Sequence, residues 1–349
     1  MSIDIQHAYN ILYPHFQERL CLNEPLVSHC AFGVGGPADI WVTLKSQQEL
    51  VDLVNLCAEQ HWPLLLVGSG RNIIFADAGV RGIVARIDFH HYQINMQTET
   101  SALLIVEAGA CWDQILDTLL PLGWSGLEFG VGISGTLGAG IVSNAGARNW
   151  DLGQILEWID VLDARGSDSD PDDQFAPATK RHYTRNELDL SYRHSRLRSK
   201  RSTVIDDEGK LVFSPRHLIE PPEIVLRLGL HLSYQDSQQL LTQRDIYLRE
   251  RRQREPSLPL TGPIFKDHQR TSARDLIAQV GLQGQIHGKS QISEQNANYL
   301  VNLGGASAED MLQLIVAAHQ QVLRQCGIDL MLNVDLRGEW SHPDQTNPL

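Results

Sequence analysis

The spacing of apolar residues along the chain predicts alternating helices and strands. Apolar positions recur at helical spacing in five stretches, and a very polar sixth helix ends before Pro256. The helices cover residues 1–22, 46–60, 113–120, 273–280 and 308–326, with the polar one over 247–254. Short apolar runs predict strands over residues 40–42, 64–67, 82–85, 103–107, 158–163, 224–232 and 330–336. The class is therefore mixed α and β.

Two long interruptions break this pattern. Residues 165–181 are polar and contain proline, and residues 200–222 form a second interruption. We expect both to be surface insertions rather than domain linkers. A chain of 349 residues is long enough for two or three domains.

Two glycine-rich loops each follow an apolar run. The first reads Gly68-Ser69-Gly70-Arg71-Asn72, and the second, residues 132–146, holds five glycines. Glycine is favoured where a backbone turns tightly or closely approaches a partner. Two such loops suggest one large anionic ligand held by backbone N–H groups. The same glycines would also suit two tight turns in a packed core.

The charge balance of the chain limits the kinds of ligand that it can be expected to bind. The chain has 42 acidic and 29 basic residues, a net charge of −13. This acidity argues against nucleic acid, whose binding needs a basic surface. Basic runs at residues 193–201 and 249–254 are where an anionic ligand would find positive charge, although most such runs are solvated faces.

Cysteine usage and the N-terminus bear on location. The five cysteines are scattered and form no C-x-x-C pair, so we expect reduced thiols. The sequence has no cluster of histidine and cysteine typical of a zinc site, so we expect no metal. The N-terminus lacks the apolar core of a signal peptide. No apolar run approaches the ~20 residues that span a bilayer. We expect a cytoplasmic protein that does not enter membranes.

Two further motifs have alternatives. Gly288-Lys289-Ser290 resembles the end of a P-loop, but Gln283 stands where that motif requires glycine. Leu190 and Tyr192 alternate with polar neighbours, which predicts that Arg193 ends a short extended segment. A guanidinium there could bind a carboxylate through two hydrogen bonds, or it could be a solvated surface arginine.

A series of motifs then follows in fixed order. They are Phe32 to Asp39, Gly68 to Asn72, Gly79 to Gly82, Gly126 to Phe129, Gly132 to Gly140, Asn144 to Ala147, Tyr192-Arg193-x-Ser195, Gly262-x-x-Phe265-Lys266, Gly281-Leu282-x-Gly284 and Ser293-Glu294-x-x-Ala297-Asn298. In this order and spacing the chain resembles the UDP-N-acetylenolpyruvoylglucosamine reductase (UDP-N-acetylmuramate dehydrogenase) family, in its shorter subtype. The motifs run from about residue 20 to about residue 330.

The resemblance implies an α+β fold of the vanillyl-alcohol-oxidase type. Two α+β lobes, residues 1–98 and 99–235, would hold FAD, and a C-terminal α+β domain, residues 236–349, would cover the substrate. We further expect a monomer that acts on a small anionic UDP-sugar.

The resemblance also implies the chemistry. In the family, NADPH reduces FAD, and hydride passes to an enolpyruvyl double bond in peptidoglycan precursor synthesis, which serves cell wall formation, cell shape and cell division. Arg193 takes the place of the catalytic arginine, and Lys266 and Gln291 would bind substrate. The positions that would bind FAD are Gly68, Ser69, Gly70, Arg71, Asn72, Gly132, Ser134, Gly135, Thr136, Gly138, Ala139, Asn144 and Gly146.

Two positions depart from the family at its reacting centre. Pro263 stands where the family has the serine that donates a proton, and proline has no proton to give. Asn333 stands where the family has a glutamate, and an amide is no acid near neutral pH. Smaller departures are Arg71, Ser134, Arg148, Asp267-His268 and Lys289.

Three functions are consistent with these departures. The first is the family's reductase with a displaced proton donor: Thr261, His268, His287 or a water. The second is a flavoenzyme with another substrate, whose pocket Arg148, Asp267 and Lys289 would define. The third is a flavin-binding protein without turnover.

Overall fold

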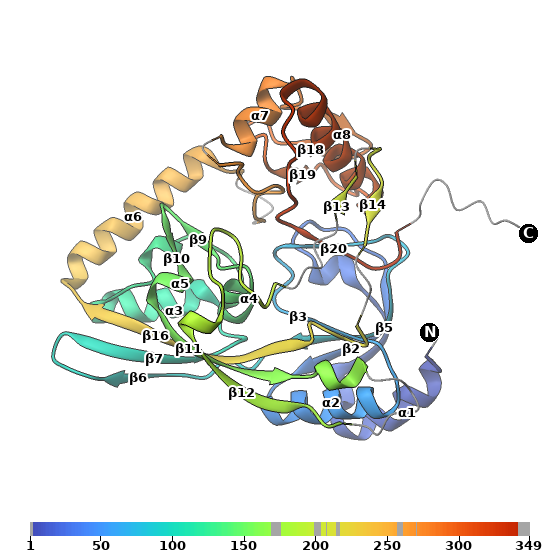
Figure 1. Ribbon diagram of the computed structural model, residues 1–349, viewed down its shortest axis with the longest axis vertical. Coiled ribbons are helices and arrows are strands. Elements are labelled where there is room, and N and C mark those ends of the chain that lie inside the picture. The colour runs from blue at the N-terminus through green and yellow to red at the C-terminus, as the bar shows by residue number, and fades with distance from the viewer. Residues whose placement is uncertain are drawn as a thin grey trace, which may run out of the picture.

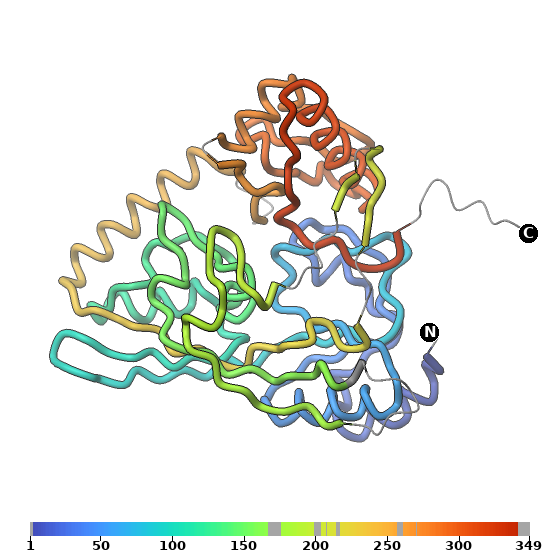
Figure 2. Tube along the Cα trace, in the orientation of Figure 1, coloured from blue at the N-terminus to red at the C-terminus, as the bar shows by residue number. Residues whose placement is uncertain are grey.

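The structure, a computed structural model, describes residues 3–168, 176–198, 204–206, 208–213, 217–256, 261–269 and 271–340. Figure 1 shows two β-sheets side by side and, above them, a smaller unit of helices and short strands. Helix α6 (Ser237–Arg254) runs from the second sheet to this upper unit. In Figure 2 the chain passes from the first sheet to the second, then to the upper unit, and finally returns towards the first sheet.

The first sheet has five strands in the order β1-β2-β5-β3-β15. They are β1 (Leu20–Pro25), β2 (Pro37–Leu44), β5 (Val80–Ile87), β3 (Leu64–Val67) and β15 (Ile219–Glu220). All run parallel except β1, which pairs antiparallel with β2. Helices α1 (Ile5–Phe16) and α2 (Gln47–Glu59) bury their apolar faces in the core of this sheet. The predicted cap of α2 is confirmed, since the Ser46 side chain accepts a hydrogen bond from the Glu49 N–H.

The predicted helix over residues 1–22 is wrong in its last third. Helix α1 ends at Phe16, Gln17 has a positive φ of 48°, and β1 begins at Leu20. Leu20 pairs with Val42 of β2. This pairing with a distant strand, which local spacing does not contain, places residues 20–22 in the sheet.

The second sheet is antiparallel and has six strands. Its order is β12-β11-β16-β7-β6, with β8 also paired to β16. The strands are β12 (Thr179–Thr184), β11 (Leu156–Asp163), β16 (Glu223–Tyr234), β7 (Ser101–Glu107), β6 (Tyr92–Met96) and β8 (Trp124–Ser125). The helices of this lobe are α3 (Trp112–Leu119), α4 (Leu137–Val142) and α5 (Leu152–Ile155). Helix α4 packs against β7 and β16.

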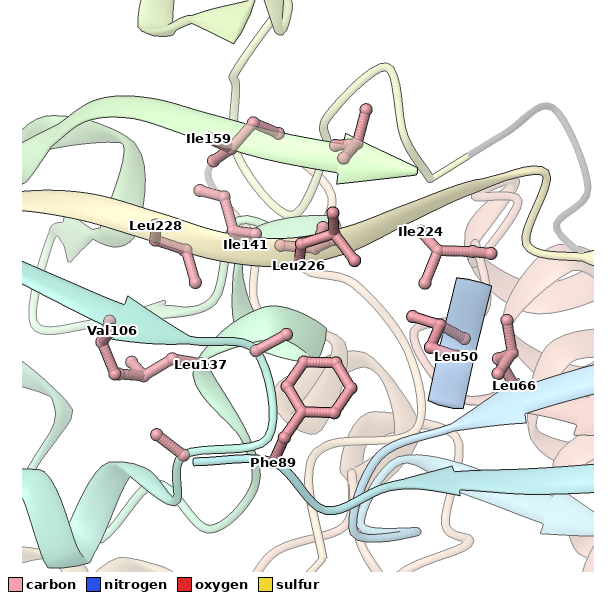
Figure 3. Close-up of a cluster of buried hydrophobic side chains, with 14 of the residues drawn as sticks. Leu50, Leu66, Phe89, Val106, Leu137, Ile141, Ile159, Ile224, Leu226 and Leu228 are labelled. Carbon is pink, nitrogen blue, oxygen red and sulfur yellow. The ribbon is translucent and has the colours of Figure 1, made fainter. Parts of the chain in front are cut away.

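One apolar core joins the two sheets. Figure 3 shows Leu50 of α2 and Leu66 of β3 beside Phe89, with Leu226 and Leu228 of β16 continuing the cluster. Leu137 and Ile141 of α4 lie in the same cluster and are fully buried. The second glycine-rich stretch, residues 132–146, is therefore not a loop throughout, since it contains α4, which this packing fixes.

The upper unit is built around a long helix. It contains α7 (Ala273–Gln279), α8 (Ala308–Cys326) and the three-stranded sheet β17 (Ile286–His287), β18 (Ser290–Ile292) and β19 (Leu300–Asn302). Its core also includes residues of the first lobe, among them Phe32 and Phe75. Strand β20 (Asp335–Arg337) pairs in parallel with β4 (Ile73–Phe75), directly after the first glycine-rich loop.

Three elements lie elsewhere than the predicted boundaries place them. Strand β6 belongs to the second sheet although it precedes residue 98, and α6 contacts the second lobe although it follows residue 235. Strand β15 ends the predicted insertion 200–222 but joins the first sheet, where Ile219 is fully buried. The predicted insertion 165–181 ends in β12; its residues 169–175, and 200–203, 207 and 214–216 of the other insertion, lie outside the described residues.

The remaining short pairs are β9 (Gly146–Ala147) with β10 (Trp150–Asp151) and β13 (Val204–Ile205) with β14 (Leu211–Val212). None of the helices in the described ranges combines the length and the apolar character needed to cross a membrane.

Candidate active site

The two glycine-rich loops face each other. The first links β3 to β4, and the second contains α4, whose first turn is capped by the Thr136 side chain. A Cβ atom at Gly68 would lie 2.8 Å from Oγ1 of Thr136, and one at Gly135 would lie 3.9 Å from Oγ of Ser69. At Gly68 the absent side chain makes room for Thr136, whereas at Gly135 a Cβ would make only an ordinary contact and the positive φ of +129° is what favours glycine.

Other glycines in these loops serve packing. Gly70 has φ +65°, and a Cβ there would lie 1.8 Å from the carbonyl oxygen of His29. A Cβ at Gly138 would lie 2.5 Å from that of Ala108, and one at Gly146 would lie 2.1 Å from the Trp150 oxygen. Some of these glycines therefore fit the predicted anion site, and others fit the alternative prediction of tight turns in a packed core.

A cavity of about 540 Å³ lies between the two loops and the upper unit. Its size is in the usual range of small-molecule sites. The predicted site residues that line it are Gly68, Ser69, Gly70, Arg71, Asn72, Ser134, Gly135, Thr136, Gly138, Ala139, Gly146 and Arg193. Four predicted site residues are not among those that line it: Gly132, Asn144, Lys266 and Gln291.

Three of these four have structural contacts instead. Nε2 of Gln291 donates to the Gly284 carbonyl at 3.2 Å. Gly132 has φ +85°, and a Cβ there would lie 2.5 Å from Cδ of Arg251. The buried Asn144 side chain donates to the Ser191 carbonyl at 2.9 Å and accepts from the Gly153 N–H at 2.9 Å. Because both ends of this amide are satisfied within the protein, Asn144 fixes the segment that carries Arg193 rather than facing the cavity.

Arg193 lies in a turn and not in an extended segment. Its φ is +53°, and its neighbours Ser191 and His194 form the bridge that closes the turn. The expected extended conformation is therefore wrong, since the turn reverses the chain at this residue. The turn brings Arg193 to the cavity, where its guanidinium lies 5.8 Å from the Tyr192 ring centre.

Positive charge gathers near Arg193. Burial lowers the pKa of Lys266, and the nearby Arg198 and Arg193 lower it further, while Asp335 opposes them. Arg198 also lines the cavity. An anionic group bound here would offset this repulsion among cations.

The remaining charges of the lining are partly neutralised. Arg337 pairs with Glu220 and Arg251 with Glu255, each at 2.7 Å. Arg71, Arg193 and Arg274 also line the cavity, and no carboxylate of the described residues forms a salt bridge with them. The cavity therefore offers unpaired cations in a protein whose net charge is −13.

The two positions that depart from the family's reacting centre touch each other. Nδ2 of Asn333 donates to the carbonyl oxygen of Pro263 at 2.9 Å. The Asn333 carbonyl in turn accepts from Nδ2 of Asn72 at 2.7 Å and from Nη2 of Arg198 at 2.6 Å. The two replacements thus form one hydrogen-bonded unit, which links the first glycine-rich loop to the upper unit.

The candidate replacement residues fall into two groups. Thr261 and Asp267 line the cavity, as do Pro263 and Asn333. His268, His287, Arg148 and Lys289 are not among the lining residues. Arg148 lies over the Tyr247 ring at 3.9 Å and donates to the Phe129 carbonyl at 2.8 Å, so it anchors α6 instead of shaping a new pocket.

Sequence reasoning missed several lining residues. Arg198 and Arg251 lie in the two basic runs, which was the available signal, but nothing in the sequence distinguished them from solvated neighbours. Tyr299 and Glu255 both line the cavity, and burial, then Glu255, raises the pKa of Tyr299.

The residues present suit FAD. The loops meet where a pyrophosphate would need backbone N–H groups, and Arg71 adds an unpaired cation beside Gly135. Two buried polar atoms of the lining, Oδ1 of Asn72 and Oγ1 of Thr261, have no hydrogen-bond partner among the described residues. Such atoms call for a polar ligand or water.

Comparisons with known proteins agree with this geometry. Residues 38–167 match a FAD binding domain, and residues 254–337 match the C-terminal domain of UDP-N-acetylenolpyruvoylglucosamine reductase. The UDP-N-acetylenolpyruvoylglucosamine reductase of Heliobacterium modesticaldum is 31% identical over 328 residues, covering 93% of this chain and 92% of that protein. That of Moorella thermoacetica is 32% identical, covering 91% of this chain and 93% of that protein.

A solved structure bears out the fold. The UDP-N-acetylenolpyruvylglucosamine reductase of Thermus caldophilus aligns with a TM-score of 0.67 at 26% identity, covering 91% of this chain and 97% of that one. Together with the FAD binding domain, this confirms the predicted vanillyl-alcohol-oxidase-type fold. The chain therefore belongs to the UDP-N-acetylenolpyruvoylglucosamine reductase family.

Proposed function

We propose that this protein is an FAD-dependent oxidoreductase that reduces the enolpyruvyl group of UDP-N-acetylenolpyruvoylglucosamine to give UDP-N-acetylmuramate, with NADPH as electron donor. The observation that carries this proposal is the match to reductases along nearly the whole chain, 93% of it in one case. The same match favours this reaction over a flavoenzyme with another substrate and over a binding protein without turnover.

Different residues of the cavity would bind the cofactor and the substrate in this reaction. The two glycine-rich loops would hold the FAD pyrophosphate by backbone N–H groups, with Arg71 as an added charge. Bound FAD would supply the hydride for the enolpyruvyl double bond. Arg193, supported by Arg198 and Lys266, would hold the substrate carboxylate while it gains negative charge.

The cationic surroundings also account for the missing glutamate. At position 333 the amide is engaged with Pro263, so carboxylate recognition falls to the cations. We infer that the arginine and lysine side chains hold the substrate mainly by charge attraction, which is possible because a UDP-sugar is small and anionic. We further propose that the protein works as a cytoplasmic monomer without nucleic acid.

The test is anaerobic mixing of NADPH-reduced protein with UDP-N-acetylglucosamine enolpyruvate, followed by flavin absorbance. Reoxidation with formation of UDP-N-acetylmuramate is the expected result. Protein that binds FAD and is reduced, but is not reoxidised by this substrate, would contradict the proposal and support a different substrate. Protein that fails to take up FAD at all would remove every flavin-based function.

A further inference from the structure

Two unpaired polar atoms in the cavity are unexplained by the contacts described so far. Oγ1 of Thr261 and Oδ1 of Asn72 are buried and have no partner among the described residues. Thr261 is only 2% exposed. Of the described side chains with a buried, unpaired polar atom, these two are the ones that line the cavity. Buried polar groups are nearly always satisfied, so each of these two atoms calls for a polar partner.

The two atoms lie next to the replaced catalytic position. Thr261, Gly262 and Pro263 line the cavity in succession, and a Cβ at Gly262 would lie 3.3 Å from Oδ1 of Asn72. Nδ2 of Asn72 is committed to the Asn333 carbonyl, so this hydrogen bond fixes Oδ1 as the end that remains open. A hydroxyl and an amide oxygen together can hold one water, because each supplies a hydrogen-bonding atom.

Two other groups of the lining that could give a proton are constrained by their surroundings. Burial, and then Glu255, raise the pKa of the Tyr299 hydroxyl, which therefore gives up its proton less readily. The Asp267 carboxylate accepts from the Ala273 N–H at 2.9 Å and from the Tyr192 hydroxyl at 3.2 Å. The Thr261 hydroxyl, by contrast, has no hydrogen-bond partner among the described residues.

We propose that Thr261 and Asn72 hold a water that delivers the proton which Pro263 cannot give. This inference rests on the proposed function. Bound reduced FAD would supply a hydride to one carbon of the enolpyruvyl double bond, whose electron pair would move to the neighbouring carbon and its carboxylate. The water protonates that carbon, and the hydroxide left behind takes a proton from solvent. Thr261 is thus a positioning residue that acts through the water.

The test compares four proteins: the parent, Thr261→Val, Pro263→Ser and the double variant. Valine keeps the shape of threonine without its hydroxyl. Each protein is reduced with NADPH, and reoxidation by UDP-N-acetylglucosamine enolpyruvate is followed anaerobically. Thr261→Val should slow reoxidation by about 10²-fold, the lower end for loss of a positioned acid or base. Pro263→Ser should restore most of the rate in the Thr261→Val background and change little alone.

Three readouts separate proton delivery from structure. The FAD content, the rate of flavin reduction by NADPH and the Kd of substrate for the oxidised protein should be unchanged in Thr261→Val. Thr261→Ser, which keeps the hydroxyl, should retain the parent's rate. In D2O the parent's reoxidation should slow, because proton delivery lies on its path.

The outcomes are distinct. A Thr261→Val protein as fast as the parent overturns the inference while leaving the reductase function intact. Slow reoxidation accompanied by lost FAD or weakened substrate binding also overturns it, since Thr261 would then be structural. A parent protein that is not reoxidised by the substrate overturns both the proposed function and this inference.

Discussion

The cavity has two ends that tolerate sequence change in different ways. At the end formed by the glycine-rich loops, Arg71 and Ser134 depart from the family, yet glycine is kept at Gly68, where a Cβ would crowd Thr136, and at Gly135, where φ is +129°. At the other end, Pro263 and Asn333 change the side chains that would do chemistry, and the Asn333 amide donates to the backbone carbonyl of residue 263. A site formed by backbone groups can keep its binding function when its non-glycine residues change. A site formed by side chains keeps its function only if another group replaces the lost one. The following variants test this contrast, from the largest expected effect to the smallest.

Gly70→Ala should destroy the cradle. The added Cβ would lie 1.8 Å from the His29 carbonyl oxygen, so the loop must move. We expect a loss of stability of at least about 3 kcal/mol, from a left-handed backbone plus overpacking, and loss of FAD binding. Thermal unfolding and the flavin absorbance of the purified protein measure both.

The matched control for this change is Gly281→Ala. Gly281 has a similarly positive φ of +78°, but a Cβ there would meet no atom within 4 Å. This variant isolates backbone strain and should cost about 1 kcal/mol, with FAD retained. Equal effects of the two variants would show that close approach at Gly70 is not what holds the loop.

Arg193→Ala should remove carboxylate recognition. We expect kcat/KM to fall by about 10²–10³, the effect of removing one preorganised charge-stabilising donor. Arg193→Lys keeps the charge at the same backbone angle but loses the two-pronged geometry, and should recover only part of this loss. Unchanged kcat/KM in the alanine variant would place the substrate carboxylate elsewhere in the cavity.

Arg71→Ser restores the residue typical of the family. Because a charge-assisted hydrogen bond to phosphate contributes about 1.5–3 kcal/mol, the Kd for FAD should rise roughly 10- to 100-fold. Binding should also become less sensitive to salt. Riboflavin, which lacks the pyrophosphate, should bind both proteins alike. Arg274→Ser, which removes another arginine of the same cavity lining, is the matched control. A loss of riboflavin binding in Arg71→Ser would mean that the change distorts the loop.

Lys266 should give the smallest effect, visible through pH. Its pKa is lowered by burial and by Arg198 and Arg193, so it loses its charge at a lower pH than an ordinary lysine. Substrate KM should therefore rise as the pH climbs through this lowered value. The free protein should change in the opposite direction: because the unfolded chain binds the proton more tightly, stability rises with pH over the same range. Lys266→Arg should abolish the pH dependence of KM, and its persistence would assign that dependence to another group.

The sequence could predict what is encoded locally or as an ordered series of motifs. Helix α8 matches its prediction at both ends because a regular apolar face is bounded by the cap Ser307 and by Gly327. The glycine-rich loops were found because glycine has few substitutes where backbones touch. The family and the fold followed from the order of the motifs.

Other features lie beyond such reasoning because distant segments create them. The turn at Arg193 depends on a buried Asn144 whose amide reaches Ser191, 47 residues away. The contact between Pro263 and Asn333 spans 70 residues, so the two replacements read as separate losses until the structure joins them. The end of the predicted helix 1–22 fails for the same reason, since its partner strand is far along the chain.

The pairing of β20 with β4 has a consequence for biosynthesis. Asn72, at the end of the first glycine-rich loop, is hydrogen-bonded to Asn333, 261 residues later, and β20 then runs alongside β4. During synthesis the ribosome must translate this whole interval before the loop gains its second support. Until then, the first lobe of the nascent chain would lack one of the two supports of this loop. The flavin would therefore bind only after β20 has left the ribosome.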